Sequence, residues 1–297
     1  MSSLLASDGF SWNPVTDFQE LTRYAFMRDA LLAGGIAAIV CGVVGYFVVL
    51  RGVVFAADSL THVGFAGASG GVLIGISPVV GLLALTAVVA AAIGALEQRL
   101  RGRDVVIGMI LVGALGLGIL FLRLSSGYSN ETYALLFGDI LALSIHDILI
   151  LFVAGCIALA ATAAVFRPLL FASIDDEVAR ARGVPVRALA IGFLLILACA
   201  VAAATQVIGA LLALALIVAP AASAQRLTDR PTRAIGLSVL LALFVTWTGI
   251  AIAFWSPYPV SFFITSLCGA MYAVSRVIGA RRASRITARL TPQPMAA

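Results

Sequence analysis

Lysine is absent from this chain, so its positive charge comes entirely from 19 arginines. Charged residues of both signs make up only 11% of the 297 residues, whereas apolar residues make up 62% and the mean hydropathy is +1.11. A soluble domain cannot cover so much apolar surface with polar side chains, which excludes an ordinary globular fold in water. The shortage of charge predicts a protein that crosses a membrane several times.

Other missing features exclude whole classes of function. The sequence contains no Walker A loop and no dinucleotide-binding glycine fingerprint, so we expect a chain that is not an enzyme and does not itself use ATP. Its arginines lie between apolar runs instead of forming one basic stripe, which argues against nucleic acid as a partner. We expect no permanently bound cofactor. The cysteines lack metal-ligand spacing and fall inside apolar runs, so we interpret them as small core residues: Cys41, Cys156, Cys199 and Cys268.

Nine apolar runs come close to the roughly 20 residues that a helix needs to cross the hydrocarbon of a bilayer. They predict an all-α integral membrane protein with about nine transmembrane helices. A shorter apolar run at 132–144 is interrupted by Gly138 and Asp139, and we interpret it as a re-entrant or interfacial segment. The nine runs cover residues 27–50, 59–76, 78–97, 105–124, 147–166, 186–205, 207–224, 234–255 and 259–278.

The arginines predict how these helices are oriented. With nine spans and the N-terminus outside the cell, only Arg23, Arg28 and Arg123 lie outside, and the other 16 arginines lie in the cytoplasm. The first 26 residues show no removable signal peptide. We therefore predict a multi-pass protein of the inner or plasma membrane, with an extracytoplasmic or interfacial segment at 1–26, a transmembrane domain at 27–278 and a cytoplasmic tail at 279–297.

Asp58 and His62 are the ionisable pair that most strongly indicates function. At a spacing of four residues on a helix, both side chains project from one face, about one turn apart. Ionisable residues at membrane depth are costly and are by default a functional hypothesis, here the binding of a single cation. The alternative is structural, with Asp58 as the cap of the second helix and His62 hydrogen-bonded to a neighbouring helix.

A polar interruption at 171–185 lies in the predicted cytoplasmic region and resembles a short helix. Ser173 is its predicted cap, Asp175, Asp176 and Glu177 fill the first turn, and Gly183 and Pro185 end it. Such a helix is what a membrane subunit would offer to a cytoplasmic motor. A well-capped loop helix without a partner is the equal alternative.

The run from Gly209 to Ala224 contains Pro220 deep inside a predicted span, where proline removes a backbone hydrogen bond. Small residues, among them Ser223, surround this proline and permit close helix approach. The helix either lines a transport path or is an ordinary transmembrane helix, in which proline and alanine are common.

These segments together resemble a permease of the ABC-3 family, the membrane subunit of zinc, manganese or iron ABC importers. The resemblance covers nearly the whole chain, and the segments occur in the order and spacing of the family. One departure is Gly52, because many relatives carry a basic or polar residue there. The segments are Gly45 to Arg51, Asp58 to His62, Gly67, Leu136 to Gly138 with Asp147, Asp175 to Gly183, and Gly209 to Ala224.

The resemblance implies a type II-like importer fold in which two permease copies, identical or related, work with cytoplasmic ABC ATPase subunits and an extracytoplasmic solute-binding protein. It places Asp58 and His62 on the metal path. It further assigns ATPase coupling to the segment containing Asp175, Glu177, Ala179 and Gly183. Gly209, Pro220 and Ser223 then belong to a path-lining helix. Arg28, Glu131, Asp139 and Asp147 lie on the predicted outer side and are candidates for docking of the binding protein.

One carboxylate and one imidazole suit Zn²⁺ or Mn²⁺, with Fe²⁺ less favoured, as the transported cation. Two ligands are too few for tight coordination, so we expect two copies around a two-fold axis to share one ion. Two other functions remain open, namely a metal transporter driven by an ion gradient and a membrane scaffold that carries no cargo. The first would need more acidic residues within the spans.

Overall fold

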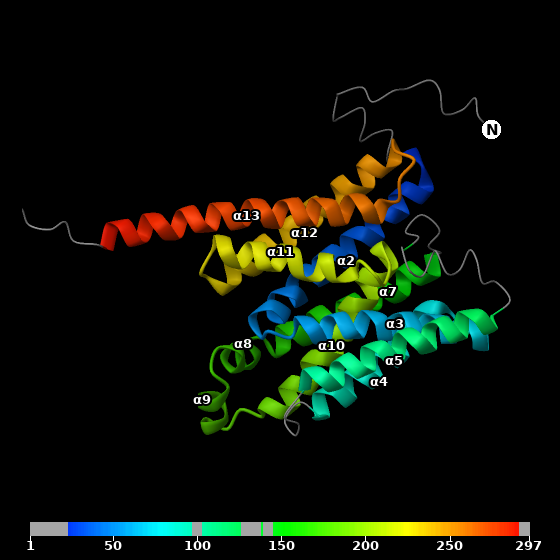
Figure 1. Cartoon of the computed structure of the whole chain (residues 1–297), viewed down its shortest axis with the longest axis horizontal. Coiled ribbons are helices and arrows are strands. Elements are labelled where there is room, and N and C mark those ends of the chain that lie inside the picture. The colour runs from blue at the N-terminus through cyan, green and yellow to red at the C-terminus, as the bar shows by residue number, and fades with distance from the viewer. Residues whose placement is uncertain (1–22, 97–102, 126–137, 139–144, 291–297) are drawn as a thin grey trace, which may run out of the picture.

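The structure is a computed structural model that describes residues 23–96, 103–125, 138 and 145–290. All regular structure in this part of the chain is helical. Helices α3, α4, α5 and α13 run lengthwise, and α2 and α10 are inclined to them (Figure 1). The helices are α2 (Ala25–Leu50), α3 (Val54–Ile74), α4 (Pro78–Leu96), α5 (Arg103–Leu124), α7 (Ile145–Ala164), α8 (Phe166–Ile174), α9 (Asp176–Ala181), α10 (Val186–Ile208), α11 (Ala213–Leu227), α12 (Pro231–Phe254) and α13 (Val260–Leu290).

Seven of the described helices are long and apolar enough to cross a membrane, namely α2, α4, α5, α7, α10, α12 and α13. A helix satisfies all its inner backbone groups internally, which is why such apolar segments fold as helices in lipid. The chain is therefore a multi-pass membrane protein, and the part that the structure describes is all-helical. The other two predicted spans are α3 and α11. Helix α11 has 15 residues and is about 22 Å long, which is shorter than the roughly 30 Å of hydrocarbon.

Several predicted boundaries differ from the structure. The second span was predicted to begin at residue 59, but α3 begins at Val54. Helix α10 continues to Ile208, and a turn then separates it from α11, so Gly209 lies in that turn and not in a path-lining helix as predicted. The predicted tail at 279–297 begins as a continuation of α13 up to Leu290.

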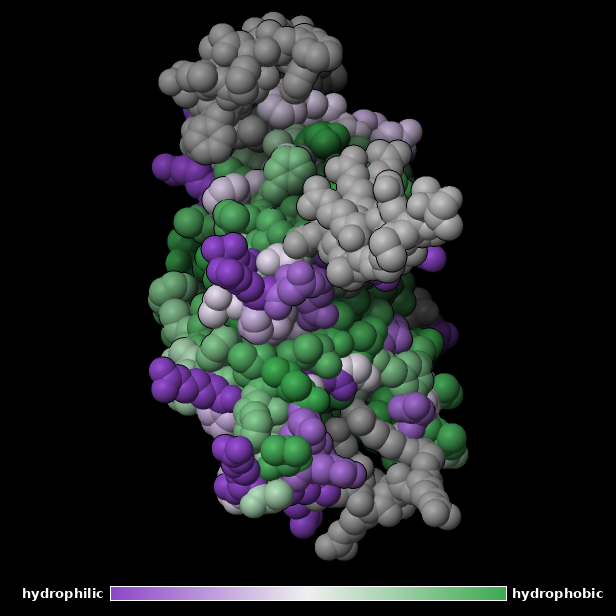
Figure 2. Space-filling model, turned by 90° about the vertical axis from the view of Figure 1, so that its left-hand side faces the viewer, coloured by the Kyte–Doolittle hydropathy of each residue, from purple (hydrophilic) through white to green (hydrophobic). Residues whose placement is uncertain are grey.

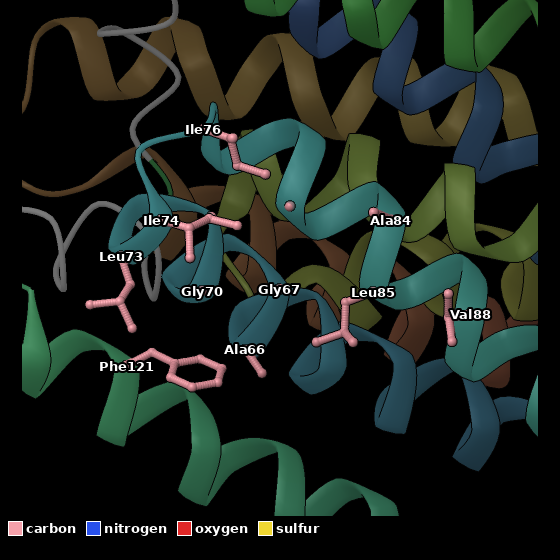
Figure 3. A pocket seen from close by; sticks show the side chains of 12 residues that line it. Ala66, Gly67, Gly70, Leu73, Ile74, Ile76, Ala84, Leu85, Val88 and Phe121 are labelled. Atoms are coloured by element: carbon pink, nitrogen blue, oxygen red, sulfur yellow. The ribbon is translucent and has the colours of Figure 1, made fainter.

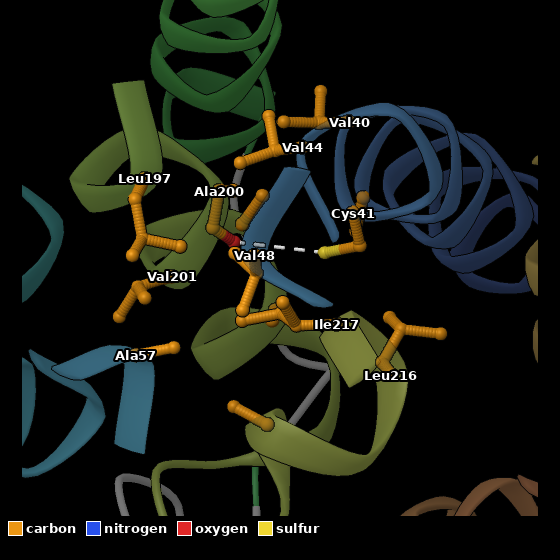
Figure 4. Close-up of a cluster of buried hydrophobic side chains, with 14 of the residues drawn as sticks. Val40, Cys41, Val44, Val48, Ala57, Leu197, Ala200, Val201, Leu216 and Ile217 are labelled. Atoms are coloured by element: carbon orange, nitrogen blue, oxygen red, sulfur yellow. Dashed lines mark hydrogen bonds between the residues drawn. The ribbon is translucent and has the colours of Figure 1, made fainter. Parts of the chain in front are cut away.

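The core lies where α2 and α10 pack against each other and against α11. Figure 4 shows Val44 and Val48 of α2 beside Leu197 and Val201 of α10, with Ile217 of α11 below them. The Cys41 thiol donates a hydrogen bond of 3.6 Å to the carbonyl of Ala200. All four cysteines are free, and the prediction that they are core residues holds for Cys41 and Cys268, whereas Cys156 is exposed and Cys199 is half-buried.

Gly45 permits the closest approach between α2 and α11. A Cβ atom at this position would overlap the carbonyl oxygen of Ile217 and would also meet Cβ of Ala221 at 3.4 Å. The obstacle is backbone and not a flexible side chain, so the two helices would have to separate. A residue with no Cβ is therefore required at this crossing.

We predict that Gly45→Ala destabilises the folded protein, because the added methyl group forces α2 away from α11. Overpacking of this kind typically costs about 1–3 kcal/mol. The measurement is the thermal unfolding midpoint of the purified protein in detergent. The matched control is Gly192→Ala in α10, where an added Cβ meets no atom within 4 Å. The control should keep or raise the midpoint, and equal midpoints for both variants would contradict the assigned crossing.

Candidate functional site

Asp58 and His62 lie on one face of α3, as their spacing predicted. Nε2 of His62 is 4.0 Å from Oδ1 of Asp58, and the two side chains are 13% and 33% exposed. The N-cap of α3 is Val53, and no side chain caps the helix. Asp58 is thus the fifth residue of the helix and not its cap, so the structural alternative for Asp58 is wrong.

One side-chain hydrogen bond between helices fixes how α3 is rotated. The Ser59 hydroxyl donates to the carbonyl of Ile107 in α5 at 3.2 Å. The Thr61 hydroxyl donates within α3, to the carbonyl of Asp58 at 2.7 Å. Ser59 and Thr61 are both fully buried. Asp58 and His62 consequently remain on the less buried side of the helix, together with Phe55, which is 42% exposed.

His62 is not satisfied by the residues around it. Its Nδ1 atom is buried and has no hydrogen-bond partner in the described part of the chain, and the 4.0 Å separation from Asp58 is too long for a hydrogen bond. A buried polar atom without a partner is costly, and a native structure retains one for a reason. An imidazole nitrogen and a carboxylate on one helix face form a ligand pair for a divalent transition metal. The described residues contain no group of three or more metal-ligating side chains, so Asp58 and His62 have no third candidate ligand beside them in this part of the chain.

Among the residues that the structure describes, three hydroxyl groups resemble Nδ1 of His62 in being buried without a hydrogen-bond partner. They are Oγ of Ser223 in α11, Oγ1 of Thr205 near the end of α10 and Oγ1 of Thr246 in α12. Pro220 lies inside α11 and is buried, as the sequence predicted. The sequence alone does not reveal which of its many hydroxyls lack partners, because a serine or threonine in a helix often donates to the carbonyl one turn earlier.

Gly209 ends α10 with a φ of 89°, a conformation that favours glycine. Gly138 packs directly on this turn, since a Cβ atom on Gly138 would lie 2.6 Å from the backbone nitrogen of Gly209. The rest of the predicted re-entrant segment at 132–144 lies outside the described residues. The backbone of Gly138 thus lies against the break between α10 and α11.

The predicted coupling segment folds as two short helices, α8 and α9. Asp175 caps α9, with its Oδ1 atom accepting a hydrogen bond of 2.9 Å from the backbone nitrogen of Val178. The prediction of Ser173 as the cap is wrong, because Ser173 lies inside α8 and donates to the carbonyl of Leu169. Asp176 and Glu177 fill the first turn as predicted, and Gly183 ends the helix with a φ of 79°.

Helix α9 has one buried side and one open side. Ala179 is fully buried against Ala172 of α8 and Val186 and Leu189 of α10, which makes α8, α9 and the start of α10 a single packed unit. The open side carries Glu177. Two apolar side chains are exposed beside it, namely Ile174 at 71% and Val178 at 42%.

Figure 2 views the end of the molecule that carries α8 and α9, where hydrophilic side chains gather among apolar ones. The candidates for docking of a binding protein belong to the opposite end. Arg28 is exposed at the start of α2, and Asp147 lies in the first turn of α7, where its Oδ1 atom accepts a 3.4 Å hydrogen bond from Ser77. Glu131 and Asp139 lie outside the described residues.

An open groove of about 420 Å³ lies between α3, α4 and α5, and its lining is apolar throughout (Figure 3). Gly67 and Gly81 bring α3 and α4 together at its floor, while Phe121 of α5 forms one wall. None of its lining residues is titratable or metal-ligating, so the groove is not the cation site. On α3, His62 lies one turn and Asp58 two turns before Ala66, the first residue of the groove lining.

The chain resembles known transport proteins over most of its length. It is 31% identical to the manganese transport system membrane protein MntC of Halalkalibacterium halodurans, over 78% of this chain and 80% of that protein. It is 25% identical to the high-affinity zinc uptake system membrane protein ZnuB of Haemophilus influenzae, over 77% of this chain and 88% of that protein.

The fold agrees with this resemblance. The structure of PsaBC from Streptococcus pneumoniae in complex with Fab superposes with a TM-score of 0.80 at 25% identity, covering 88% of this chain and 94% of that chain. The model of the ABC 3 transport family matches residues 23–279, which include every long helix described above up to the middle of α13. The chain therefore belongs to the ABC 3 transport family.

Proposed function

We propose that this chain is the transmembrane permease subunit of an ABC importer that brings a divalent transition metal into the cytoplasm. The observation that carries the proposal is the pair of Asp58 and His62. A buried imidazole nitrogen that has no partner among the described residues lies one helical turn from a carboxylate. Relatives named for manganese transport and for zinc uptake support the same cargo class. Zinc and manganese are thus the proposed substrates, ahead of iron.

Two copies of the chain are needed to complete the site in this proposal. Each chain offers one carboxylate and one imidazole, whereas zinc usually takes four ligands and manganese takes more. Two copies around a two-fold axis would supply four ligands, and water the remainder. The partial exposure of Asp58 supports this arrangement, because a ligand that a second copy must reach cannot be sealed inside one chain.

The proposed topology has nine crossings, with α3 and α11 completing the seven long apolar helices. The N-terminus then lies outside and the C-terminus in the cytoplasm. The distribution of arginines supports this orientation, since the loops around α8 and α9 belong to the same end as Arg51, Arg226 and Arg230, and the opposite end holds Arg28 and Arg123. The proposed domains are an outer segment at 1–26, the permease domain at 27–278 and a cytoplasmic tail from 279.

The energy in this proposal comes from separate ABC ATPase subunits that bind α8 and α9. Helices α8 and α9 have a mixed apolar and acidic outer surface, and Asp175 caps α9. The surface is formed by Ile174, Val178 and Glu177. Such a surface suits a protein partner better than it suits plain solvent. An extracytoplasmic solute-binding protein would dock at the opposite end, near Arg28 and Asp147.

Transport driven by an ion gradient is less well supported. The long helices in the described part of the chain carry acidic residues only in their first two turns, namely Asp29, Asp58, Asp104 and Asp147. A proton relay through the membrane needs a chain of titratable groups along its length. A scaffold without cargo would leave the Nδ1 atom of His62, which has no partner within the described ranges, without a role.

We predict that Asp58→Asn and His62→Ala each lower metal uptake by about tenfold or more, as loss of a metal-site group commonly does. The measurement is the zinc and manganese content of metal-starved cells that lack this chain and are complemented with each variant at matched membrane levels. The wild type should restore one of the two metals, which identifies the cargo.

The matched control is Asp104→Asn, because Asp104 is an exposed carboxylate in the first turn of α5. This variant should restore the metal content as the wild type does. Full restoration by both site variants would make Asp58 and His62 structural. If even the wild type restored neither metal, the proposed import function itself would be wrong.

We predict that Asp175→Ala weakens the association with the ATPase, because it removes the cap of α9. Loss of a cap destabilises a helix by about 1 kcal/mol, which is large for a helix of six residues. The measurement is the amount of ATPase that co-purifies with the tagged permease. Asp104→Ala serves as the matched loss of a carboxylate elsewhere, and equal recovery of the ATPase with both variants would contradict the role of α9.

A further inference from the structure

Arg51 stands in the turn between α2 and α3, and its backbone is rigidly held. Gly52 follows it with a φ of 65°, and the backbone nitrogens of Gly52 and Val53 donate to the carbonyls of Val49 and Val48. This paired pattern closes the end of a helix and needs a residue that tolerates positive φ. The departure at Gly52 therefore has a structural reason, because glycine allows only three residues to separate the end of α2 from the start of α3.

The side chain of Arg51 joins two other elements to this turn. Its Nη1 atom is 3.5 Å from the hydroxyl oxygen of Ser173 in α8, and its guanidinium carbon is 5.6 Å from the ring centre of Phe193 in α10. Ser173 gives its own hydrogen to the carbonyl of Leu169, so its oxygen is available to accept from Arg51. Phe193 is buried and packs on Phe47 of α2 at a ring-centre distance of 6.2 Å.

These contacts place Arg51 between the coupling unit and the candidate metal ligands. On one side, Ser173 is two residues from Asp175, the cap of α9. On the other side, Asp58 follows Arg51 by seven residues, with only the turn and the first helical turn of α3 between them. The guanidinium group of Arg51 thus forms a direct connection between α8 and the turn that leads into α3.

We propose that Arg51 is a positioning residue that couples movement of α8 and α9 to the start of α3, and so couples ATP hydrolysis to movement of the cation past Asp58 and His62. The inference rests on the proposed function. Arginine suits this role because its planar group can stack on Phe193 and donate to Ser173 at the same time, whereas lysine is a flexible point charge. A residue that only holds positive charge at the membrane interface would be replaceable by lysine.

The test uses the full complex of this permease with its ATPase and binding protein in proteoliposomes, loaded with Mn²⁺ and with Zn²⁺ in separate experiments. The readout is the number of ions imported per ATP hydrolysed. The variants are Arg51→Lys, Ser173→Ala and the double variant. Arg233→Lys is the matched control, because Arg233 is exposed at the start of α12.

We expect Arg51→Lys to assemble with the ATPase and to hydrolyse ATP, but to import about tenfold fewer ions per ATP, in the usual range of coupling between two sites. Ser173→Ala should lower the ratio in the same direction. The double variant should fall no further than Arg51→Lys alone, because both changes break one connection. Arg233→Lys should keep the wild-type ratio.

A wild-type ratio for Arg51→Lys would overturn the inference and leave Arg51 as an interfacial charge. Loss of assembly in Arg51→Lys would overturn it as well, since that result assigns the residue to assembly instead of coupling. Failure of the proposed function is distinguishable from both outcomes, because the wild-type complex would then import neither ion at the expense of ATP.

Discussion

Close packing of α2 against its neighbours supports every functional segment of this protein. In a membrane the surrounding hydrocarbon is as apolar as a leucine side chain, so helices are held by tight contact and by hydrogen bonds between them, and not by escape from water. Gly45 lets α2 touch the backbone of α11. The Ser238 hydroxyl donates to the carbonyl of Gly42 and the Gln225 side chain to the carbonyl of Tyr46, both at 2.8 Å. The fixed end of α2 then fixes the turn at Arg51 and the start of α3.

The candidate metal site and the proposed coupling unit, formed by α8, α9 and the start of α10, depend on that frame in different ways. Asp58 and His62 are held by the rotation of α3, which the Ser59 hydrogen bond to α5 secures. Both side chains remain partly exposed, which lowers the desolvation free energy of placing two ionisable groups near the membrane. A transport site must also release its cargo, so two ligands per chain fit a path better than a closed cage would. The coupling unit is instead anchored by the small buried side chain of Ala179.

The local sequence predicted much of this accurately. The apolar runs predicted the long helices, and the four-residue spacing predicted that Asp58 and His62 share one face. The acidic first turn and Gly183 predicted α9. The errors occurred where two local signals compete. Serine and aspartate are both good N-cap residues, so Ser173 and Asp175 were both candidates. Asp175 is the N-cap of α9, because α8 continues through Ser173 and buries Ala172. The turn at Gly209 lies within a continuous apolar run, so the hydropathy of the sequence did not predict it. Hydropathy depends on side-chain polarity and contains no information about backbone direction.

The sequence by itself determined the class of the protein, its helical segments and the identity of the candidate ligands, because hydropathy, helical periodicity and capping act over a few residues. Only the tertiary structure decided that the Nδ1 atom of His62 has no partner among the residues described, that Gly45 lies against backbone, and that Arg51 contacts Ser173 and Phe193. Arg51 and Ser173 are 122 residues apart in the chain. Contacts over such separations depend on how whole helices pack, and no local pattern of residues encodes that packing.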